Sequence, residues 1–230
     1  MLVINNGVPK SGSTWIQQVL QRLCKIPGPS KTWQREGWHN PSIAPPKMAP
    51  FLASPECRNN VVCIKAHYRA DPKMTELFLK SDVRMIVSYR NMPDTIVSLY
   101  YHERKYNGCT MSLEQWLATE ADVRARDFLT IRTGWDSMSP LMIPFEQMRE
   151  NPVHWAMEIA RYSEANVSED EAAAFCAQTM KKTDTIQENS HVRTGGAGAA
   201  HELPEHWRKV IEDIERETIA AHERRREAVS

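Results

Sequence analysis

Short apolar runs alternate along this chain with segments of helical period, and this alternation constrains the fold more than any other feature. The apolar runs cover residues 2–4, 61–64, 83–89 and 141–143. The spacing of apolar residues, or a proline at a first helical turn, predicts helices that begin near residues 13, 93, 113, 152, 169 and 204. Fully apolar strands separated by helices are typical of parallel sheets covered on both faces. We therefore predict a single α/β domain over residues 1–230, with a central, mainly parallel sheet flanked by helices.

Two segments show neither a helical nor a strand period. Residues 27–60 are rich in proline and predict an irregular surface segment. The segment contains Trp33, Trp38 and His39, and Tyr68 follows the second strand. These aromatic residues would line a cleft for a planar ligand, or would anchor the loop to the core. The Gly/Ala run at residues 195–200 predicts a flexible loop.

The composition excludes several classes of function. Lys plus Arg and Asp plus Glu each number 29, so no overall basic field favours nucleic acid or an anionic membrane. No apolar stretch is long enough to span a bilayer, and the first residues lack the pattern of a signal peptide. The five cysteines include no C-x-x-C pair, which argues against a disulfide framework or a zinc site. We expect a cytoplasmic protein without nucleic-acid or membrane partners, and the sequence leaves the oligomeric state open.

The loop between the first strand and the first helix carries the residue types of an anion-binding site. Gly12 lets the backbone approach a ligand, and Lys10 supplies a positive charge next to the N–H groups of a first helical turn. Hydroxyl groups come from Ser11, Ser13 and Thr14. The alternative is an ordinary Gly/Ser turn that caps a helix. The spacing differs from G-x-x-x-x-G-K-[ST], which disfavours a magnesium nucleoside triphosphate site.

The seven residues Pro-Lys-Ser-Gly-Ser-Thr-Trp at positions 9–15 resemble the 5′-phosphosulfate loop of sulfotransferases that use 3′-phosphoadenosine 5′-phosphosulfate (PAPS). The resemblance implies a P-loop-like site for the donor after the first strand. Its expected donor-binding residues are Lys10, Ser11, Gly12, Ser13, Thr14 and Trp15. The indole of Trp15 would stack on adenine or pack in the apolar stripe of the helix.

A second stretch, residues 89–102, resembles the family segment that holds the 3′-phosphate. Arg90 and Ser98 take the places of its arginine and serine. An arginine offers a planar fork of donors suited to phosphate, and the serine follows about two helical turns later. Without the resemblance, both residues read as ordinary surface positions.

The third signature of the family, Arg-Lys-Gly followed by Gly and Trp, is altered here. Arg193, Thr194 and Gly195 stand in its place, without the lysine and the tryptophan. The resemblance makes these three residues donor contacts, and we expect residues 193–200 to form a lid that orders when the donor binds. Phe145 stands where the family often has a tyrosine near adenine, and core packing is the favoured role of Phe175.

Residues 64–67, Ile-Lys-Ala-His, resemble the family's catalytic lysine and histidine at the end of the second strand. By this resemblance His67 is the general base, Lys10 stabilises the leaving phosphate and Lys65 steadies the sulfuryl oxygens. No metal is required, and no acidic cluster or His/Cys spacing indicates one.

The resemblance thus implies an enzyme that transfers the sulfuryl group of PAPS to a hydroxyl or amine of a small-molecule acceptor. Two alternatives stay open. One is a nucleotide kinase-like enzyme with a P-loop, against which the spacing of the loop counts. The other is a catalytically impaired nucleotide-binding protein of the same fold, against which the presence of Lys65 and His67 counts.

Overall fold

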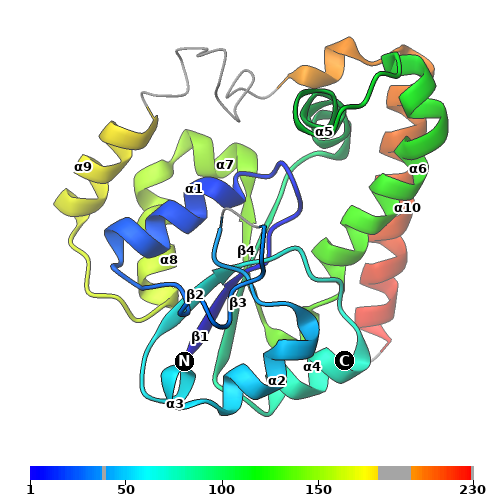
Figure 1. Ribbon diagram of the computed structural model, residues 1–230. Coiled ribbons are helices and arrows are strands. Elements are labelled where there is room, and N and C mark those ends of the chain that lie inside the picture. The colour runs from blue at the N-terminus through cyan, green and yellow to red at the C-terminus, as the bar shows by residue number, and fades with distance from the viewer. Residues whose placement is uncertain (38–39, 181–197, 229–230) are drawn as a thin grey trace.

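Four parallel strands form the centre of the molecule in this computed structural model, which describes residues 1–37, 40–180 and 198–228 (Figure 1). The strands are β1 (Leu2–Asn5), β2 (Val62–Lys65), β3 (Val83–Tyr89) and β4 (Leu141–Pro144). Their order in the sheet is β2-β1-β3-β4, and each neighbouring pair runs parallel. The predicted α/β fold with a parallel sheet is therefore confirmed.

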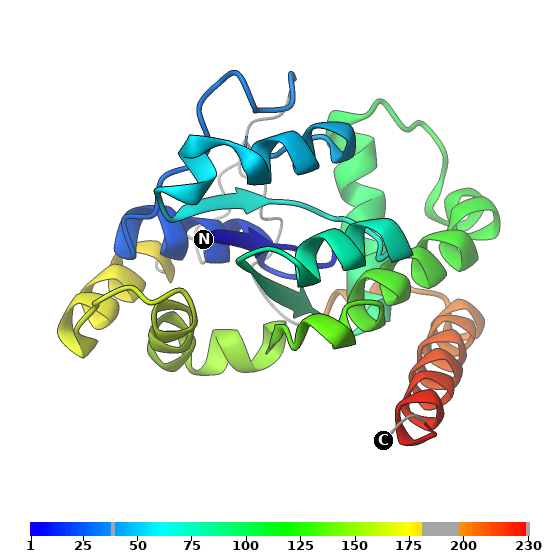
Figure 2. The same ribbon diagram turned by 90° about the horizontal axis from the view of Figure 1, so that it is seen from below.

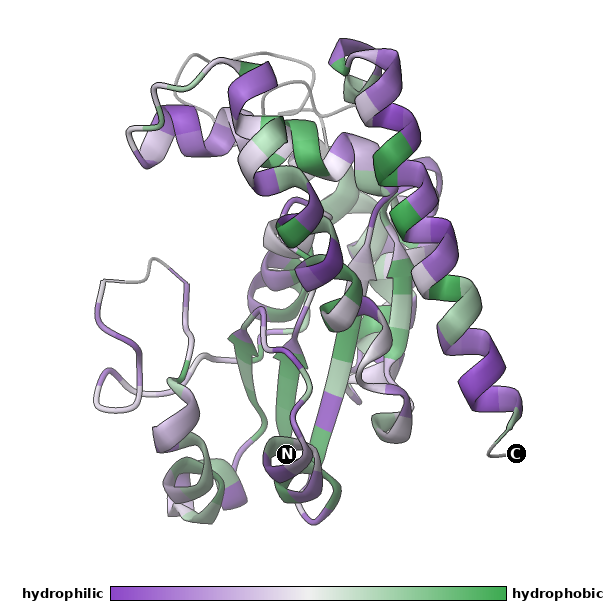
Figure 3. Cartoon of the chain, turned by 90° about the vertical axis from the view of Figure 1, so that its right-hand side faces the viewer, coloured by the Kyte–Doolittle hydropathy of each residue, from purple (hydrophilic) through white to green (hydrophobic). Residues whose placement is uncertain are grey.

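Helices cover both faces of this sheet. Successive residues of a strand point to opposite faces, so the apolar strands place side chains on both faces that the helices bury. Val3 packs on one face, which is covered by α1 (Ser13–Gln18), the π-helical segment η1 (Val19–Leu23), α7 (Phe145–Glu150), α8 (Pro152–Tyr162) and α9 (Glu169–Met180). Leu2 and Ile4 pack on the other face, which is covered by α2 (Pro45–Ala53), α3 (Pro55–Arg58), α4 (Pro72–Leu79) and the 3-10 turn η2 (Asp136–Met138). This double cover explains why the strands are mostly apolar (Figure 3).

A third group of helices lies beside the sheet. It consists of α5 (Met92–Tyr106), α6 (Leu113–Thr133), the 3-10 turn η4 (Ala199–Glu202) and α10 (Glu205–Glu227). These helices bury their own apolar cluster, which includes Tyr100, Trp116 and Ile211. Figure 2 shows α9, in yellow, and α10, in red, at opposite sides of the sheet. None of the helices in the described ranges is both long and apolar enough to cross a membrane.

The expectation of an irregular segment over residues 27–60 is wrong for its second half. Helices α2 and α3 occupy residues 45–53 and 55–58. Each begins with a proline in its first turn, where no backbone N–H is needed. The Ser54 hydroxyl also caps α3 by accepting from Cys57 N at 3.3 Å. Helices this short leave too few turns for an apolar period to be visible in the sequence.

Candidate active site

The segments that follow β1, β2 and β3 meet at one edge of the sheet. β1 lies between β2 and β3, and all three run in the same direction, so their carboxyl ends lie side by side. This topology brings the loop around Lys10 together with Lys65, His67 and Arg90, which lie far apart in the sequence. Crevices at this edge are where open α/β sheets bind ligands.

The loop after β1 has an unusual backbone. Lys10 has φ 69° and Gly12 has φ 86°, both in the left-handed region. A left-handed lysine is strained, and such strain is concentrated at functional sites. A Cβ on Gly12 would lie 2.4 Å from Met148 Cε and 3.0 Å from the Phe145 ring, so glycine is required there both by φ and by the packing of α7.

The loop is fixed to the end of β3 by Ser11. The Ser11 hydroxyl is fully buried, lies 2.5 Å from the Val8 carbonyl oxygen and shares a hydrogen bond of 2.7 Å with the Ser88 hydroxyl. In this structure that hydroxyl holds the loop in shape, a role different from the ligand contact that the resemblance implies. Ser13 is buried as well, and its carbonyl accepts from Asn5 Nδ2 at 2.7 Å.

Thr14 differs from these two serines, because its side chain is exposed at the start of α1. Its Oγ1 accepts a hydrogen bond of 2.8 Å from Lys65 Nζ, which joins the loop to the end of β2. Ser13 and Thr14 lie in the first turn of α1, where backbone N–H groups have no acceptor within the helix. This turn is suited to an anion.

Three cations lie at this edge and repel one another. Burial, together with the charge of Lys10, lowers the pKa of Lys65 to about 8. Burial also lowers the pKa of Lys10, with a further contribution from the charge of Arg90. An anion bound among these three groups would favour their charged forms. The residues present therefore fit a ligand that carries several negative charges.

His67 lies beside the loop with one ring nitrogen engaged. Its Nδ1 lies 2.5 Å from the carbonyl oxygen of Gly7. A carbonyl accepts only, so Nδ1 carries the proton and the lone pair of the neutral ring is on Nε2. The pKa of His67 is lowered to about 4, mainly by burial. The bond to Gly7 raises this pKa, and the charges of Lys65 and Lys10 lower it. The imidazole is therefore neutral at pH 7 and has a basic nitrogen at Nε2.

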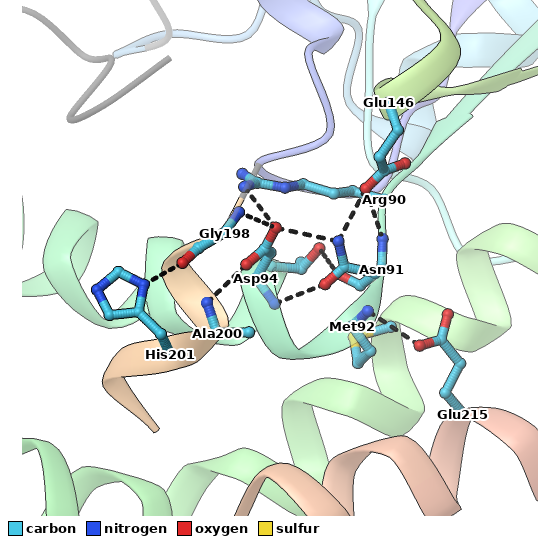
Figure 4. Close-up of polar contacts among 10 residues, drawn as sticks. Arg90, Asn91, Met92, Asp94, Glu146, Gly198, Ala200, His201 and Glu215 are labelled. Atoms are coloured by element: carbon cyan, nitrogen blue, oxygen red, sulfur yellow. Dashed lines mark hydrogen bonds and ion pairs between the residues drawn. The ribbon is translucent and has the colours of Figure 1, made fainter. Parts of the chain in front are cut away.

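Arg90 is held by a carboxylate that the sequence analysis missed (Figure 4). Its guanidinium donates to Asp94 at 3.0 Å and stacks over the Phe145 ring at 4.6 Å. Asp94 also accepts from the backbone N–H groups of Gly198 at 3.0 Å and Ala200 at 2.7 Å. Burial raises the pKa of Asp94, but these bonds and the charge of Arg90 outweigh it and hold the pKa below 3.8.

The amino end of α5 is satisfied by side chains of the protein itself. Asn91 caps the helix by accepting from Asp94 N at 2.9 Å, and Glu146 accepts from Asn91 N at 3.3 Å. Met92 N donates to Glu215 at 3.0 Å, which links this end of the helix to α10 (Figure 4). The backbone N–H groups of Asn91, Met92 and Asp94 thus already have acceptors within the protein. Ser98 lies farther along α5 and is half-buried.

Trp15 is half-buried and is positioned by α9. Its Nε1 donates to Thr179 Oγ1 at 3.1 Å, and its ring lies 6.3 Å from that of Phe175. Phe175 is buried in the core, as the sequence analysis favoured. Both alternatives for Trp15 stay open, because the indole packs on the helix and keeps part of its surface exposed.

The structure covers part of the expected acceptor wall and of the third signature. Trp33 packs edge-on against Phe51 at 5.5 Å, so it anchors its segment to the core. The Tyr68 hydroxyl donates to the Ile43 carbonyl. Other expected residues lie outside the described residues: Trp38, His39, Arg193, Thr194 and Gly195. Of the expected lid, Gly198 to Ala200 are described, and Asp94 accepts from the backbone N–H groups of Gly198 and Ala200.

The comparison with known families rests on nearly the whole chain. The sulfotransferase domain matches residues 3–222. The chain belongs to the sulfotransferase family. Mouse sulfotransferase SULT7A1, solved in complex with PAP, is a similar structure with a TM-score of 0.63 and 15% identity over 93% of this chain and 81% of that chain. Among curated protein sequences no match was found.

Two further similar structures are complexes of retinol dehydratase. The complex with retinol and PAP has a TM-score of 0.59 and 15% identity, and it covers 95% of this chain and 80% of that chain. The complex with androsterone and the inactive cofactor PAP has a TM-score of 0.58 and 14% identity over the same shares. At these identities the likeness establishes the fold of this sulfotransferase. Its ligands have to be inferred from its own residues.

The sequence analysis missed the residues that support this site. Ser88 lies inside a predicted strand, Asp94 lies inside a predicted helix, and Asn6 and Gly7 simply follow the first predicted strand. In the part of the chain that the structure describes, no group of three or more His, Cys, Asp or Glu side chains is placed to hold a metal ion. The site is therefore one of cations and a neutral histidine.

Proposed function

We propose that this sulfotransferase transfers the sulfuryl group of PAPS to a hydroxyl or amine of a small molecule, with His67 as the general base. One observation carries the proposal: three cations from the ends of three adjacent strands converge where a neutral histidine presents Nε2. A sulfuryl donor with a 3′-phosphate is an anion that such a cluster would hold. A nucleotide kinase-like function has no comparable support.

The donor is held by residues on two segments. The loop of residues 10–14 and the first turn of α1 bind the 5′ end, with Lys10 against the phosphate that leaves. Arg90 and Ser98 bind the 3′-phosphate, and Asp94 and Phe145 keep the Arg90 fork in one orientation. Arg193, Thr194 and Gly195 join them in this proposal by family resemblance. Trp15 borders the adenine.

The acceptor is activated by His67. Its Nε2 takes the proton of the attacking hydroxyl or amine while the acceptor atom bonds to sulfur and the bond from sulfur to the nucleotide oxygen breaks. Lys65 lies between the loop and β2 and steadies the sulfuryl oxygens, and Lys10 stabilises the charge on the leaving oxygen. These steps need no metal ion.

The acceptor is proposed to be a small molecule, not a macromolecule. The similar retinol dehydratase complexes hold retinol and androsterone, which supports a compact apolar acceptor with one reactive group. Tyr68 lies next to His67 and borders the place where such an acceptor reacts.

The test is a comparison of nucleotides by calorimetry. Adenosine 3′,5′-bisphosphate is expected to bind more tightly than AMP, because only the former carries a 3′-phosphate. Arg90→Ala is expected to erase most of this preference, a loss of about 1.5–3 kcal/mol as for a hydrogen bond to a charged group. Arg84→Ala, at the opposite end of β3, is the matched control and leaves the preference intact. Equal affinity of the wild type for both nucleotides would rule out the 3′-phosphate site.

Turnover is measured separately with labelled PAPS and a panel of phenols, alcohols and amines, with and without a chelator. His67→Ala is expected to lose turnover while it keeps its affinity for adenosine 3′,5′-bisphosphate, since the base acts on the acceptor. Labelled product in the presence of chelator supports the metal-free reaction. No product from any acceptor with intact nucleotide binding would favour the impaired nucleotide-binding protein instead.

A further inference from the structure

The ends of β1 and β2 stay joined beyond the last residue of either strand. Asn5 pairs with Lys65 in the ladder, and Ala66 N then donates to the Asn5 carbonyl at 2.9 Å. Beyond this bond, the side chain of Asn6 joins the two segments. Its Oδ1 accepts from Tyr68 N at 2.6 Å, and its Nδ2 donates to the Tyr68 carbonyl at 3.0 Å.

These contacts hold His67 through the residue before it, the residue after it and its own side chain. The residue before it is bonded to Asn5, the residue after it is bonded to Asn6, and its own Nδ1 is bonded to the Gly7 carbonyl. Three consecutive residues at the end of β1 and just after it, Asn5 to Gly7, thus hold three consecutive residues after β2, Ala66 to Tyr68. Asn6 is fully buried, and its own backbone N–H donates to Ile86 O at 2.8 Å, so β3 fixes its backbone independently of its side chain.

We infer that Asn6 is a positioning residue that sets the orientation and the tautomer of His67. The inference rests on the proposed function, in which Nε2 of His67 is the base. If the Asn6 amide is lost, the Tyr68 carbonyl keeps its bond from Trp135 Nε1, but the Tyr68 N–H loses the acceptor that Asn6 provides. The backbone of His67 can then turn, and Nδ1 no longer has a fixed acceptor.

The test reads the imidazole directly, without any acceptor. Long-range proton–nitrogen NMR of the full chain, with His67 assigned through a His67→Gln variant, reports its tautomer and its pKa. We expect the wild type to hold the proton on Nδ1 and to stay neutral well below pH 6.5. In Asn6→Ala we expect a mixture of tautomers and a pKa that rises toward 6.5. The charged groups that face the ring, Lys65 and Lys10, are the same in both proteins.

Kinetics give the second readout. A misplacement of about 1 Å can cost on the order of 100-fold in rate. We expect Asn6→Ala to lower kcat at least about tenfold, while its affinity for adenosine 3′,5′-bisphosphate stays within about twofold. Asn60→Ala is the matched control. It removes an exposed amide that donates to Glu56 O at 2.9 Å near the other end of β2, and it is expected to change neither readout.

Asn6→Asp is a second variant for the case that Asn6→Ala does not fold. It retains an acceptor for Tyr68 N and loses only the donor. Its carboxylate beside the ring is expected to raise the pKa of His67. If both Asn6 variants fold and keep the wild-type tautomer and pKa, the inference is wrong. If instead the wild type carries its proton on Nε2 or titrates near 6.5, the proposed base geometry fails first, and the two failures are told apart.

Discussion

Gly7 is the position where one added methyl group tests the packing of the site most directly. A Cβ built on Gly7 would lie 2.1 Å from Ser88 Oγ and 3.0 Å from Ser13 Cβ. Atoms in contact are optimally about 3.5 Å apart, so the chain or Ser88 must move by more than about 1 Å. The Ser88 hydroxyl cannot swing away at no cost, because it shares a hydrogen bond with Ser11.

Gly7→Ala is therefore expected to lower the free energy of unfolding by about 1–3 kcal/mol, as overpacking does in a tight core. Ser88→Ala alone loses one hydrogen bond, about 0.5–1.5 kcal/mol. In the double variant the clashing oxygen is gone, so its loss is expected to be smaller than the sum of the two single losses by about 1 kcal/mol or more. Because the Gly7 carbonyl holds His67, kcat is expected to fall in Gly7→Ala and to recover in part when Ser88 is also changed.

Urea unfolding of the wild type, the two single variants and the double variant gives the coupling energy between the two positions. Turnover of the same four proteins gives the coupling in kcat. Gly108→Ala serves as control: its φ of +70° strains an alanine, but nothing lies within 4 Å of its Cβ. It is expected to cost about 1–2 kcal/mol and to show no coupling to Ser88. A Gly7→Ala variant as stable as the wild type, or strict additivity with Ser88→Ala, would refute the close approach.

Two further predictions concern charge. The proposed reaction needs His67 neutral and Lys65 charged, so kcat/KM for the donor is expected to fall below about pH 4 and above about pH 8, following the pKa values of the two groups. A pH–rate profile with an acid limb near 6.5 would contradict it. Asp94→Asn leaves the buried Arg90 charge without its carboxylate and is expected to cost about 3–5 kcal/mol of stability at pH 7. The folded pKa of Asp94 lies below its unfolded value, so its contribution is present above about pH 3.8 and disappears as the pH falls through the folded pKa, and urea unfolding at pH 3 and pH 7 measures this difference.

The sequence was sufficient to find the four strands, because each contains three consecutive apolar residues. Residues 83–89 were predicted as a strand and form β3, and Pro204 was predicted to open the last helix, which begins at Glu205. Helix α4 was missed. Its signal was local: Asp71 precedes Pro72 and caps the helix by accepting from Lys73 N and Met74 N at 3.0 and 3.1 Å. A proline in the first turn thus marks α2, α3 and α4, three short helices that an apolar period does not reveal.

Candidate residues could be chosen from the sequence where the proposed role lies in the residue's own side chain, and not where a residue acts through a neighbouring strand. Lys10 and His67 follow predicted strands and carry the side chains of the proposed chemistry, so pattern and resemblance led to them as candidates. Ser11 was expected to face a ligand, but its hydroxyl faces Ser88, and that contact exists only because β1 and β3 are neighbours. Asn6 is of the same kind, because its partner is Tyr68, 62 residues away in the sequence. Strand order is a property of the whole fold, and no local pattern states it.

The distribution of charge explains how a chain of zero net charge can hold a polyanion. With 29 acidic and 29 basic residues, long-range attraction of an anion is weak. The attraction is instead local, since Lys10 and Lys65 are partly removed from water, where charges interact more strongly. Their lowered pKa values measure how unfavourable these cations are without an anion. An anion that binds reverses this penalty, so part of its affinity comes from relief of a repulsion that the fold already contains. Arg90, which cannot lose its proton, is held in the same place by Asp94.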